Sequence, residues 1–428
     1  MSASSASIYT TLSIDNGKKP PVDLSGVPDK SGNSSKTLSV DYYESLYSPM
    51  ITVNLLNVDD GGSTADDKES LGTVKDNLPI TGGEKVSIKI ESKSGILDLT
   101  KNPLIVSSAP IIKQDTLKQI VSLSLVSQYE YKNRDIPVRK KLKGKINQMV
   151  SKLIKEVKVP DEAVDIEETL NMDAIIGRSK TPYDLIISLA KKSIPHTNGD
   201  PGYFFYETQD GLNFKSIDTL IKQKPIATYR YEGVLRANSD NDANDFKILT
   251  SPIFKKDQDI INALKSGSYK ARIITTNPLT HEINEEFVYL TPKQTLGKDS
   301  EPKDPSDNKD NAIRTYHHLL DIGSMDPDVK YDVENNPFTW EAKSAMRYDM
   351  LHSQVVDIQV PCNVNLRAGD VIECTFERIT EGDKVTDVYN EQQSGKYLIL
   401  HLCHHFDPVR SYTSLTLARD TYGLYGKK

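Results

Sequence analysis

Histidine and cysteine alternate near the end of the chain, in the run His401-Leu402-Cys403-His404-His405. On a strand, His401, Cys403 and His405 share one face, because successive side chains point to opposite sides. Imidazole and thiolate groups bind transition metals, so this is the best metal candidate in the sequence. Three side chains on one straight strand are too collinear to surround an ion, and no second CxxC or HxxxH motif supplies further ligands. We therefore favour packing against neighbouring strands and predict no metal site.

Two other segments imitate metal sites. Residues 281–285 read His-Glu-Ile-Asn-Glu, with Glu where a zinc-protease helix has its second His, and they follow an Asn-Pro turn. Residues 240–244 read Asp-Asn-Asp-Ala-Asn, like the start of a calcium loop. There, Asp245 replaces the turn glycine and Ser251 the chelating twelfth residue, so a solvated turn is favoured. The pair His317-His318 is a weaker candidate of the same kind as the run at 401–405.

The sequence contains no complete catalytic motif. No Gly-Lys pair is followed by Ser or Thr, as a phosphate-binding loop requires, and neither GxSxG nor GxGxxG occurs. Asp326, Asp328 and Asp332 are candidate acid and base groups, but their polar surroundings give no reason to expect a raised pKa. We predict no catalytic residue, no cofactor and no enzymatic activity.

A basic run extends from Lys132 to Lys158, with ten Lys or Arg and two acids, and an acidic stretch follows at 161–168. Nucleic acid is a disfavoured partner, because no aromatic residues are interleaved for base stacking. A solvated helix face, or a charge-complementary contact between subunits, explains the run better.

Composition sets the broad class. The 428 residues carry 53 Lys and Arg against 60 Asp and Glu, a net charge of -7, which argues against a strongly basic nucleic-acid binder. The three cysteines all lie in the last fifth of the chain, which is no disulfide framework and fits a reducing compartment during folding. The start has no apolar signal segment, and no apolar run approaches the ~20 residues of a spanning helix.

Alternating apolar and polar residues predict strands near both ends of the chain. The first 132 residues read as a β-domain with long polar loops at 15–39 and 59–79, and the chain is β-rich again beyond 351. Predicted strands cover 8–14, 50–58, 85–90, 121–125, 355–360, 371–376, 396–406 and 412–418.

The middle of the chain has a mixed pattern. Apolar spacings of 3 and 4 predict a helix over 137–157, and Thr181-Pro182 predicts the start of a second helix. A hairpin is predicted at 203–214, a further helix at 250–265, and strands at 272–275 and 286–289. Residues 292–312 contain almost no apolar side chain and read as a solvated loop or linker.

One pattern occurs near both ends. Ile80-Thr81-Gly82-Gly83-Glu84 precedes an alternating strand, and so does Leu366-Arg367-Ala368-Gly369-Asp370. A turn glycine, an acid and a half-buried strand in both places suggest that one kind of small barrel occurs twice.

Three groups of motifs resemble the central baseplate hub protein of contractile-tailed, T-even-like bacteriophages. The third group also resembles the base of VgrG-type secretion spikes. The motifs occupy 42–53 (YYESLYSPMITV), 181–193 with 202–216 (GYFFYETQDGLNFKS), and 367–372 with 394–399, 404–406 and 412–417.

The resemblance implies an α+β, β-rich fold, with two tail-tube-like β-barrel domains flanking and interleaved with a mixed helical and β middle region. The expected domains are 1–132, the first barrel; 133–225, the mixed middle; 226–350, connecting strands, helices and the polar loop; and 351–428, the second barrel.

The resemblance also implies a non-enzymatic hub of the tail baseplate in the virion, assembled in the host cytoplasm. The expected hub is a homotrimer that joins the hexameric tail tube to the trimeric central spike, contacts the wedge proteins and leaves a channel through which DNA passes without specific binding. The alternatives are a tail-tip cell-wall hydrolase and a glycan- or receptor-binding tail protein.

Overall fold

The computed structural model describes most of the chain. The described residues are 7–25, 36–59, 78–116, 118–197, 199–231, 245–257, 259–278, 281–290, 295–297, 314–319, 337–378 and 389–421. The predicted calcium-loop segment 240–244, the acids Asp326, Asp328 and Asp332, and most of 292–312 lie outside them.

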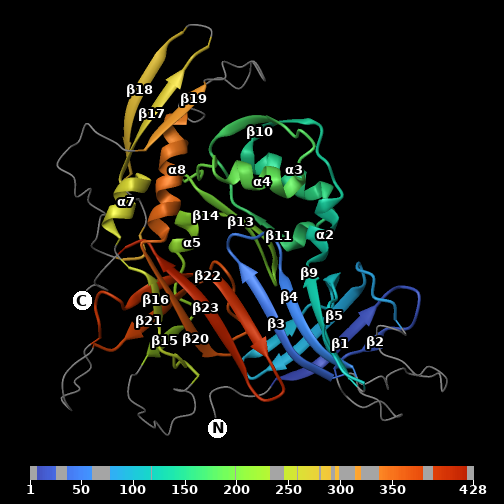
Figure 1. Cartoon of the computed structure of the whole chain (residues 1–428). Helices are drawn as coiled ribbons and strands as arrows, with labels where there is room; N and C mark the ends of the chain where they lie inside the picture. Colours follow the sequence, from blue (N-terminus) through green and yellow to red (C-terminus); the bar gives the residue numbers. More distant parts are fainter. Residues whose placement is uncertain are drawn as a thin grey trace.

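Strands from the two β-rich ends of the chain, together with two short strands from its middle (Thr228–Tyr231 and Ile253–Lys256), form one sheet of 15 strands, which runs along the lower half of the molecule (Figure 1). Its main path is β16-β20-β23-β22-β3-β4-β9-β7-β5-β1-β2. The strands of the path are β1 (Ile8–Asp15), β2 (Val22–Asp23), β3 (Lys36–Ser45), β4 (Thr52–Asp59), β5 (Lys85–Ser92), β7 (Leu104–Ser108), β9 (Gln119–Val126), β16 (Ile253–Lys256), β20 (Gln354–Pro361), β22 (Gly395–Phe406) and β23 (Ser411–Arg419); β6 (Gly95–Asp98), β8 (Ile111–Gln114), β15 (Thr228–Tyr231) and β21 (Val371–Phe376) lie beside it.

The sheet consists of the same five-strand pattern used twice. The first sheet unit is β3, β4, β5, β7 and β9, and the second sheet unit is β16, β20, β21, β22 and β23. If the strands of each unit are numbered 1 to 5 along the chain, both units have the spatial order 1-2-5-4-3, with antiparallel neighbours. The β-rich α+β class predicted from the sequence is therefore confirmed.

The repeated sequence pattern corresponds to one turn that occurs in both units. In the first, Val106 accepts the N–H of Gly83 at 2.9 Å and donates its own to the carbonyl of Glu84 at 2.9 Å. In the second, Ile399 makes the same two bonds with Gly369 and Asp370, both at 2.9 Å. Gly83 has φ +94° and Gly369 φ +90°, which side chains with a Cβ rarely adopt.

The acidic residues of the two turns, Glu84 and Asp370, also make equivalent hydrogen bonds. A Glu84 oxygen accepts the N–H of Thr81 at 2.7 Å, and an Asp370 oxygen accepts the N–H of Arg367 at 2.7 Å. Each acid therefore closes its own turn over the residue three positions earlier. The local geometry is the reason the same residue types occur in both places.

The two units are joined side by side through β22 and β3, which we call the seam. One edge of β22 pairs with β21 over Gly395–Leu398 and then with β3 over His401–Phe406. Because strand 1 of the first unit pairs with the second unit, it does not close onto its own strands. The expectation of two closed barrels is therefore not met by the described strands, which form one open sheet.

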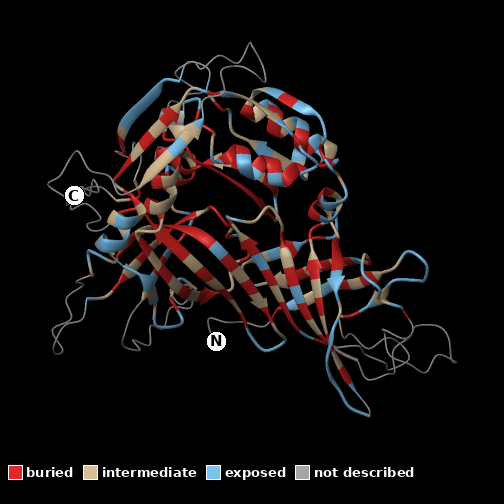
Figure 2. Ribbon diagram, turned by 45° about the horizontal axis from the view of Figure 1, so that its top comes forward, coloured by how far each residue is buried: buried red, intermediate tan, exposed pale blue. Residues whose placement is uncertain are grey.

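Most of the sheet encloses a single apolar core. Inward side chains alternate with outward ones along β9 and β20, where every second residue is buried (Figure 2). The main cluster draws on both units, including Val53, Leu125, Val356 and Leu417. A second cluster lies in the middle region and a third between that region and the sheet.

The middle region lies above the sheet in Figure 1. The helices and the hairpin predicted for this region are found. The start of the first helix is corrected: residues 141–145 form a strand, and the helix begins only at Ile146. The reason is that exposed lysines alternate with buried Leu142 over residues 141–143, as on the surface of a strand. The elements are α2 (Gln128–Arg134), β10 (Lys141–Lys145), α3 (Ile146–Glu156), a 3-10 turn (Asp161–Ala163), β11 (Val164–Ile166), β12 (Met172–Ile176), α4 (Pro182–Ala190), β13 (Tyr203–Thr208), β14 (Gly211–Ser216) and α5 (Ile217–Ile221).

A small three-stranded sheet projects at the upper left of Figure 1 and packs on a long helix. Its elements are α7 (Ile260–Ser266), β17 (Lys270–Thr276), β18 (Ile283–Tyr289), β19 (Thr315–Leu319) and α8 (Pro337–Leu351). The helix predicted at 250–265 is therefore shorter, because residues 253–256 pair with β20 as strand β16. Among the described residues, no helix is both long and apolar enough to span a membrane.

Candidate functional site: a polar sheet face and the buried junctions beside it

Six central strands of the sheet, from β20 to β9, present mainly polar side chains on their outer surface, which we call the polar face. Cross-strand pairing aligns these side chains in rows, such as Gln359, Ser414, Cys403, Tyr43 and Thr52. The polar members are Asp357, Gln359, Tyr412, Ser414, Thr416, His401, Cys403, His405, Asp41, Tyr43, Thr52, Asn54, Ser122 and Ser124.

The charges on the polar face are compensated. Asp41 Oδ1 lies 2.5 Å from Nδ1 of His405 across the seam, and Asp357 Oδ2 lies 2.5 Å from Nζ of Lys255. The hydrogen bond that the His405 ring donates to Asp41 is the main cause of a raised His405 pKa. The face therefore offers hydroxyl, amide and paired groups, with no excess of one sign.

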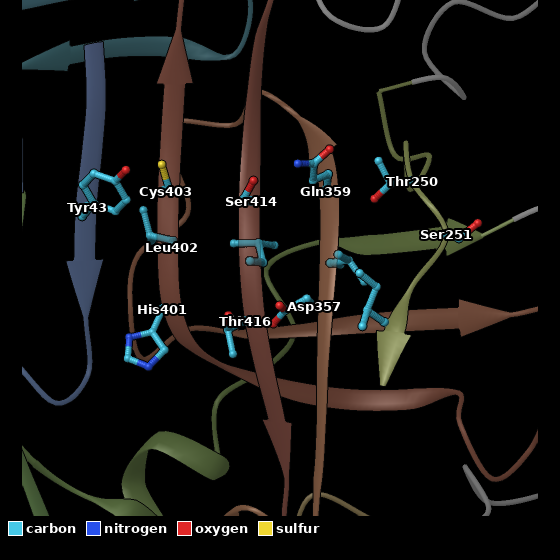
Figure 3. A pocket seen from close by; sticks show the side chains of 13 residues that line it. Tyr43, Thr250, Ser251, Asp357, Gln359, His401, Leu402, Cys403, Ser414 and Thr416 are labelled. Atoms are coloured by element: carbon cyan, nitrogen blue, oxygen red, sulfur yellow. Dashed lines mark hydrogen bonds between the residues drawn. The ribbon is translucent and has the colours of Figure 1, made fainter. Parts of the chain in front are cut away.

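A hollow of about 450 Å³ opens on this face above the second sheet unit (Figure 3). Its floor is formed by strand residues such as Asp357, His401, Ser414 and Thr416, and part of its wall is formed by Thr250, Ser251 and Ile253. Ser414 and Thr416 place hydroxyls on the floor beside apolar side chains such as Leu402, and the Asp357 carboxylate accepts the Thr416 hydroxyl at 2.9 Å.

The metal candidates from the sequence lie on this face but do not form a ligand set. His401 and Cys403 line the hollow, whereas His405 is held by Asp41 and by Asp407 at 3.5 Å. Burial raises the pKa of the Cys403 thiol to about 12, so the thiolate that a metal needs is disfavoured. Within the described part of the chain, no three His, Cys, Asp or Glu side chains are grouped to hold an ion.

The other sequence candidates are also separate. Residues 283–285 lie on the edge strand β18 and not on a helix, and His281 has φ +59°. His317 and His318 point to opposite sides of β19, with His318 Nδ1 3.6 Å from Glu341. The basic run supplies exposed lysines of β10 and α3, where Lys155 lies 3.7 Å from Asp161 of the acidic stretch.

A buried carboxylate joins three distant parts of the chain. Glu44 of β3 is 2% exposed, and its oxygens accept bonds from the Tyr42 hydroxyl at 2.6 Å, the N–H of Gln209 at 2.8 Å and the N–H of Ala368 at 2.9 Å. The first sheet unit, the β13–β14 hairpin and the turn of the second unit therefore meet at one group. Burial raises the Glu44 pKa to about 7, and nearby Arg367 opposes that shift.

A second buried carboxyl lies in the same hairpin. Glu207 is 1% exposed, and its Oε2 accepts the N–H of Ile51 at 3.3 Å. Burial raises its pKa to about 8. Raised pKa values are typical of catalytic acids, but both carboxyls are sealed from solvent and bound to backbone groups, so their geometry is that of structural links.

A buried arginine links the middle region to the end of the sheet. Arg347 of α8 is 0% exposed, and its guanidinium lies 3.1 Å from Asp218 of α5 and 3.0 Å from Asp420, directly after β23. Sequence analysis missed Glu44, Glu207 and Arg347. A charged residue at an inward position of an alternating strand, as with Glu44 beside Val40 and Tyr42, was the available signal.

Comparisons with known proteins support a phage tail context. No family model matches the chain. It is 20% identical over 374 residues to the probable baseplate hub protein gp334 of Vibrio phage KVP40, covering 83% of this chain and 85% of that protein. The resemblance to baseplate hub proteins that the motifs indicated is thereby confirmed.

Two solved structures share the fold. A tail protein from Neisseria meningitidis MC58 matches with TM-score 0.53 and 12% identity over 97% of each chain. The 43 kDa tail protein of prophage MuSo2 from Shewanella oneidensis matches with TM-score 0.52 and 9% identity, over 96% of this chain and 98% of that one.

Proposed function

We propose that this chain is a structural subunit of a phage tail baseplate hub, in which three copies join a sixfold tail tube to a threefold central spike. The observation that carries the proposal is the duplicated sheet. Two units of identical strand order lie side by side in one chain, so three chains supply six similar units around a threefold axis. In this proposal each sheet unit serves as one tube-like domain.

The polar face supports a channel-lining role. A channel that lets DNA pass must not hold phosphates, and this face has hydroxyl and amide groups whose few charges are paired. We assign the polar face to the wall of the channel, and the middle region with the small sheet on α8 to contacts with the spike and wedge proteins.

The proposed role is non-enzymatic and belongs to the assembled virion. The buried carboxyls Glu44 and Glu207 support it, because neither is placed to reach a substrate. The similarity to a named baseplate hub protein supports the same location.

The test is the mass of the purified chain, alone and with the spike and tube proteins of the same virion. We expect a trimer that binds both. A monomer with no affinity for either protein would overturn the proposal, and so would cell-wall clearing that a single carboxylate substitution abolishes.

A further inference from the structure

A two-stranded ribbon at the top of the middle region has two different sides. Strands β10 and β12 pair antiparallel, with Leu142 opposite Ile175 on the side that packs on the second apolar cluster. The other side faces outward, away from α3 and α4, and we call it the ribbon face (Figure 1). Its residues are Lys141, Lys143 and Lys145 of β10 and Met172, Ala174 and Ile176 of β12.

The ribbon face consists of two rows of different chemistry. Pairing sets Lys141 opposite Ile176 and Lys145 opposite Met172, so a row of ammonium groups runs beside a row of apolar side chains. Neighbours in one row are about 7 Å apart, and the two rows are about 5 Å apart. Met172 is 41% exposed and Ile176 is 43% exposed, so the described part of the chain leaves the apolar row open to solvent.

Further basic residues lie at the end of the ribbon where the chain enters β10 and leaves β12. Arg139, Arg178 and Lys180 are exposed there. Arg178 and Ser179 have φ +49° and +61°, and the Lys180 N–H closes the turn on the Gly177 carbonyl at 3.0 Å. Two successive side chains in the left-handed region are strained, and such strain is concentrated at functional sites. The strained turn holds two cations at the edge of the ribbon face.

The acids nearest in sequence to the ribbon lie elsewhere. Asp173 points to the packed side of β12, opposite Gly144, and bonds to Lys192 at 3.0 Å. Glu156 of α3 pairs with Lys140. None of the six residues of the ribbon face is acidic, so the face contributes only positive charge.

A partner that fits the ribbon face must use both rows. Phosphates of nucleic acid would contact only the lysines and leave Met172 and Ile176 in water. A membrane surface is bound through bulkier apolar groups, and the ribbon face has no aromatic side chain. A helix with an acidic stripe beside an apolar stripe matches both rows, because its residues i and i+4 are about 6 Å apart, close to the spacing within a strand row.

A second copy of this chain does not offer such a helix in its described part. No described helix has more than two acids, and the two in α8, Glu341 and Asp349, lie near His318 and Arg314. The acidic stretch at 161–168 forms a 3-10 turn and strand β11. The matching helix therefore belongs to a different protein.

We propose that the ribbon face binds an acidic amphipathic helix of another baseplate protein, with carboxylates along the lysine row and apolar side chains on Met172 and Ile176. This inference rests on the proposed hub role, which supplies the setting for the partner, and it adds the surface and the chemistry of one contact of the middle region. Arg178 and Lys180 add two cations beside the Lys141 end of the row.

Pairwise binding of the chain to each purified baseplate protein of the same virion tests the surface. The affinity for one of them should fall at least tenfold in Lys141→Glu with Lys143→Glu, because two attractions become repulsions. It should also fall about tenfold in Met172→Ser with Ile176→Ser, which removes the apolar row. Loss with the lysines alone would overturn the two-row contact.

Lys222→Glu with Lys224→Glu is the matched control. Both lysines are exposed and two positions apart, as Lys141 and Lys143 are, so the change in net charge is the same. The control should change the affinity less than twofold. If the charge reversal at 141 and 143 lowers the melting temperature, Lys141→Gln with Lys143→Gln replaces it, since that variant removes the charges without reversing them.

Carbodiimide coupling, which joins a lysine amine to a carboxylate in direct contact, identifies the partner residues. Lys141, Lys143 or Lys145 should couple to acids spaced three or four apart in one segment of the partner, the spacing of a helix face. Coupling to a second copy of this chain, or to acids without that spacing, would overturn the proposed helix.

A short DNA duplex and phosphatidylglycerol vesicles are the competing probes. Neither should bind in a way that depends on residues 141 and 143. Binding to either that is lost with the lysines but unaffected by the serine substitutions at 172 and 176 would overturn a protein partner.

The outcomes separate this inference from the proposed function. A trimer that binds spike and tube, but whose ribbon variants bind every baseplate protein as the unsubstituted chain does, would overturn the ribbon face and leave the hub standing. A monomer whose binding to one baseplate protein depends on both rows would overturn the trimeric hub and leave the contact standing. A chain that binds no baseplate protein would overturn both.

Discussion

The carboxylate of Glu44 accepts the backbone N–H of Ala368 at 2.9 Å, although 324 residues separate the two in sequence. The same carboxylate accepts the N–H of Gln209, so one side chain fixes the hairpin of the middle region against both sheet units. The relative placement of the three parts depends on this group more than on any surface ion pair, because the bond from Ala368 is buried and the bond from Gln209 is partly buried.

Glu44→Ala should destabilise the chain strongly. It leaves the buried N–H of Ala368 and the partly buried N–H of Gln209 without an acceptor, at a cost of about 3 kcal/mol in the free energy of unfolding. Glu44→Gln retains an acceptor oxygen and should cost less than half as much. Urea denaturation of both variants measures the difference, and equal losses would contradict the role given to the backbone bonds.

The stability of the chain should fall as pH rises toward 8. The pKa of Glu207 is about 8 in the folded state against an ordinary value of 4.5, so the folded state holds a proton that the unfolded state has lost. This contribution is complete below pH 4.5 and is lost as pH rises through about 8. Glu207→Gln, which cannot ionise, should flatten the decline.

The comparison is best made above pH 6.5, because His404 acts in the opposite direction. Burial lowers the His404 pKa to about 3 from an ordinary 6.5, so its contribution is lost as pH falls through that interval. Denaturation between pH 6.5 and 8 excludes the effect of His404. Glu44, whose pKa is about 7, and His405, whose pKa is raised, add to the same decline, so the contribution of Glu207 is the difference between the slopes of the unsubstituted chain and Glu207→Gln. An unchanged slope in Glu207→Gln would contradict the assignment.

Removing Arg347 should lower the free energy of unfolding, because two buried acids lose their partner. Arg347→Ala leaves Asp218 and Asp420 without their shared cation, and we expect a loss of about 3–5 kcal/mol. The triple variant Arg347→Met, Asp218→Asn and Asp420→Asn removes the charges together and should recover much of that loss. Calorimetry of the two variants makes the comparison; a triple variant less stable than Arg347→Ala would refute it.

Gly369→Ala should lower the free energy of unfolding by more than the positive φ alone explains. A Cβ at Gly369 would lie 2.7 Å from the Tyr206 hydroxyl, in addition to the strain at φ +90°, and we expect a loss of about 3 kcal/mol. Gly17→Ala is the matched control, since Gly17 has φ +68° but no atom within 4 Å of its Cβ position. The control should lose about 1 kcal/mol. Thermal unfolding separates the two effects.

Chelation should leave the melting temperature unchanged. His405 is bound to Asp41, and the Cys403 thiol is disfavoured as a thiolate, so the run at 401–405 has no need of an ion. A melting temperature that falls in excess EDTA and recovers on adding zinc would restore the metal interpretation. His401→Ala is the control, and neither EDTA nor added zinc is expected to change its melting temperature.

The sequence predicted the individual strands better than it predicted how they pair, since it indicated two closed barrels and the strands form one open sheet. Alternation along β9 and β20 follows from one face being buried, which is a local property of the strand. Which strand lies beside β3 is a non-local property. The pairing with β22 spans more than 350 residues, and nothing in the residues of β3 distinguishes that neighbour from one in its own unit.

The candidate site was predicted only in part. The alternation of His401, Cys403 and His405 correctly placed them on one face, because strand geometry fixes it. The buried links at Glu44, Glu207 and Arg347 were missed, because a charged side chain is read as exposed until its partners are known, and those partners come from other segments. The repeated glycine–acid turn was found because its chemistry is local.

The seam between β3 and β22 also limits how many sheet units a closed ring of chains can contain. Since every chain contributes two linked blocks, a closed ring of such chains holds an even number of blocks, whatever curvature the blocks prefer. Rings of five or seven are unreachable, and an error in assembly must add or omit two blocks at once.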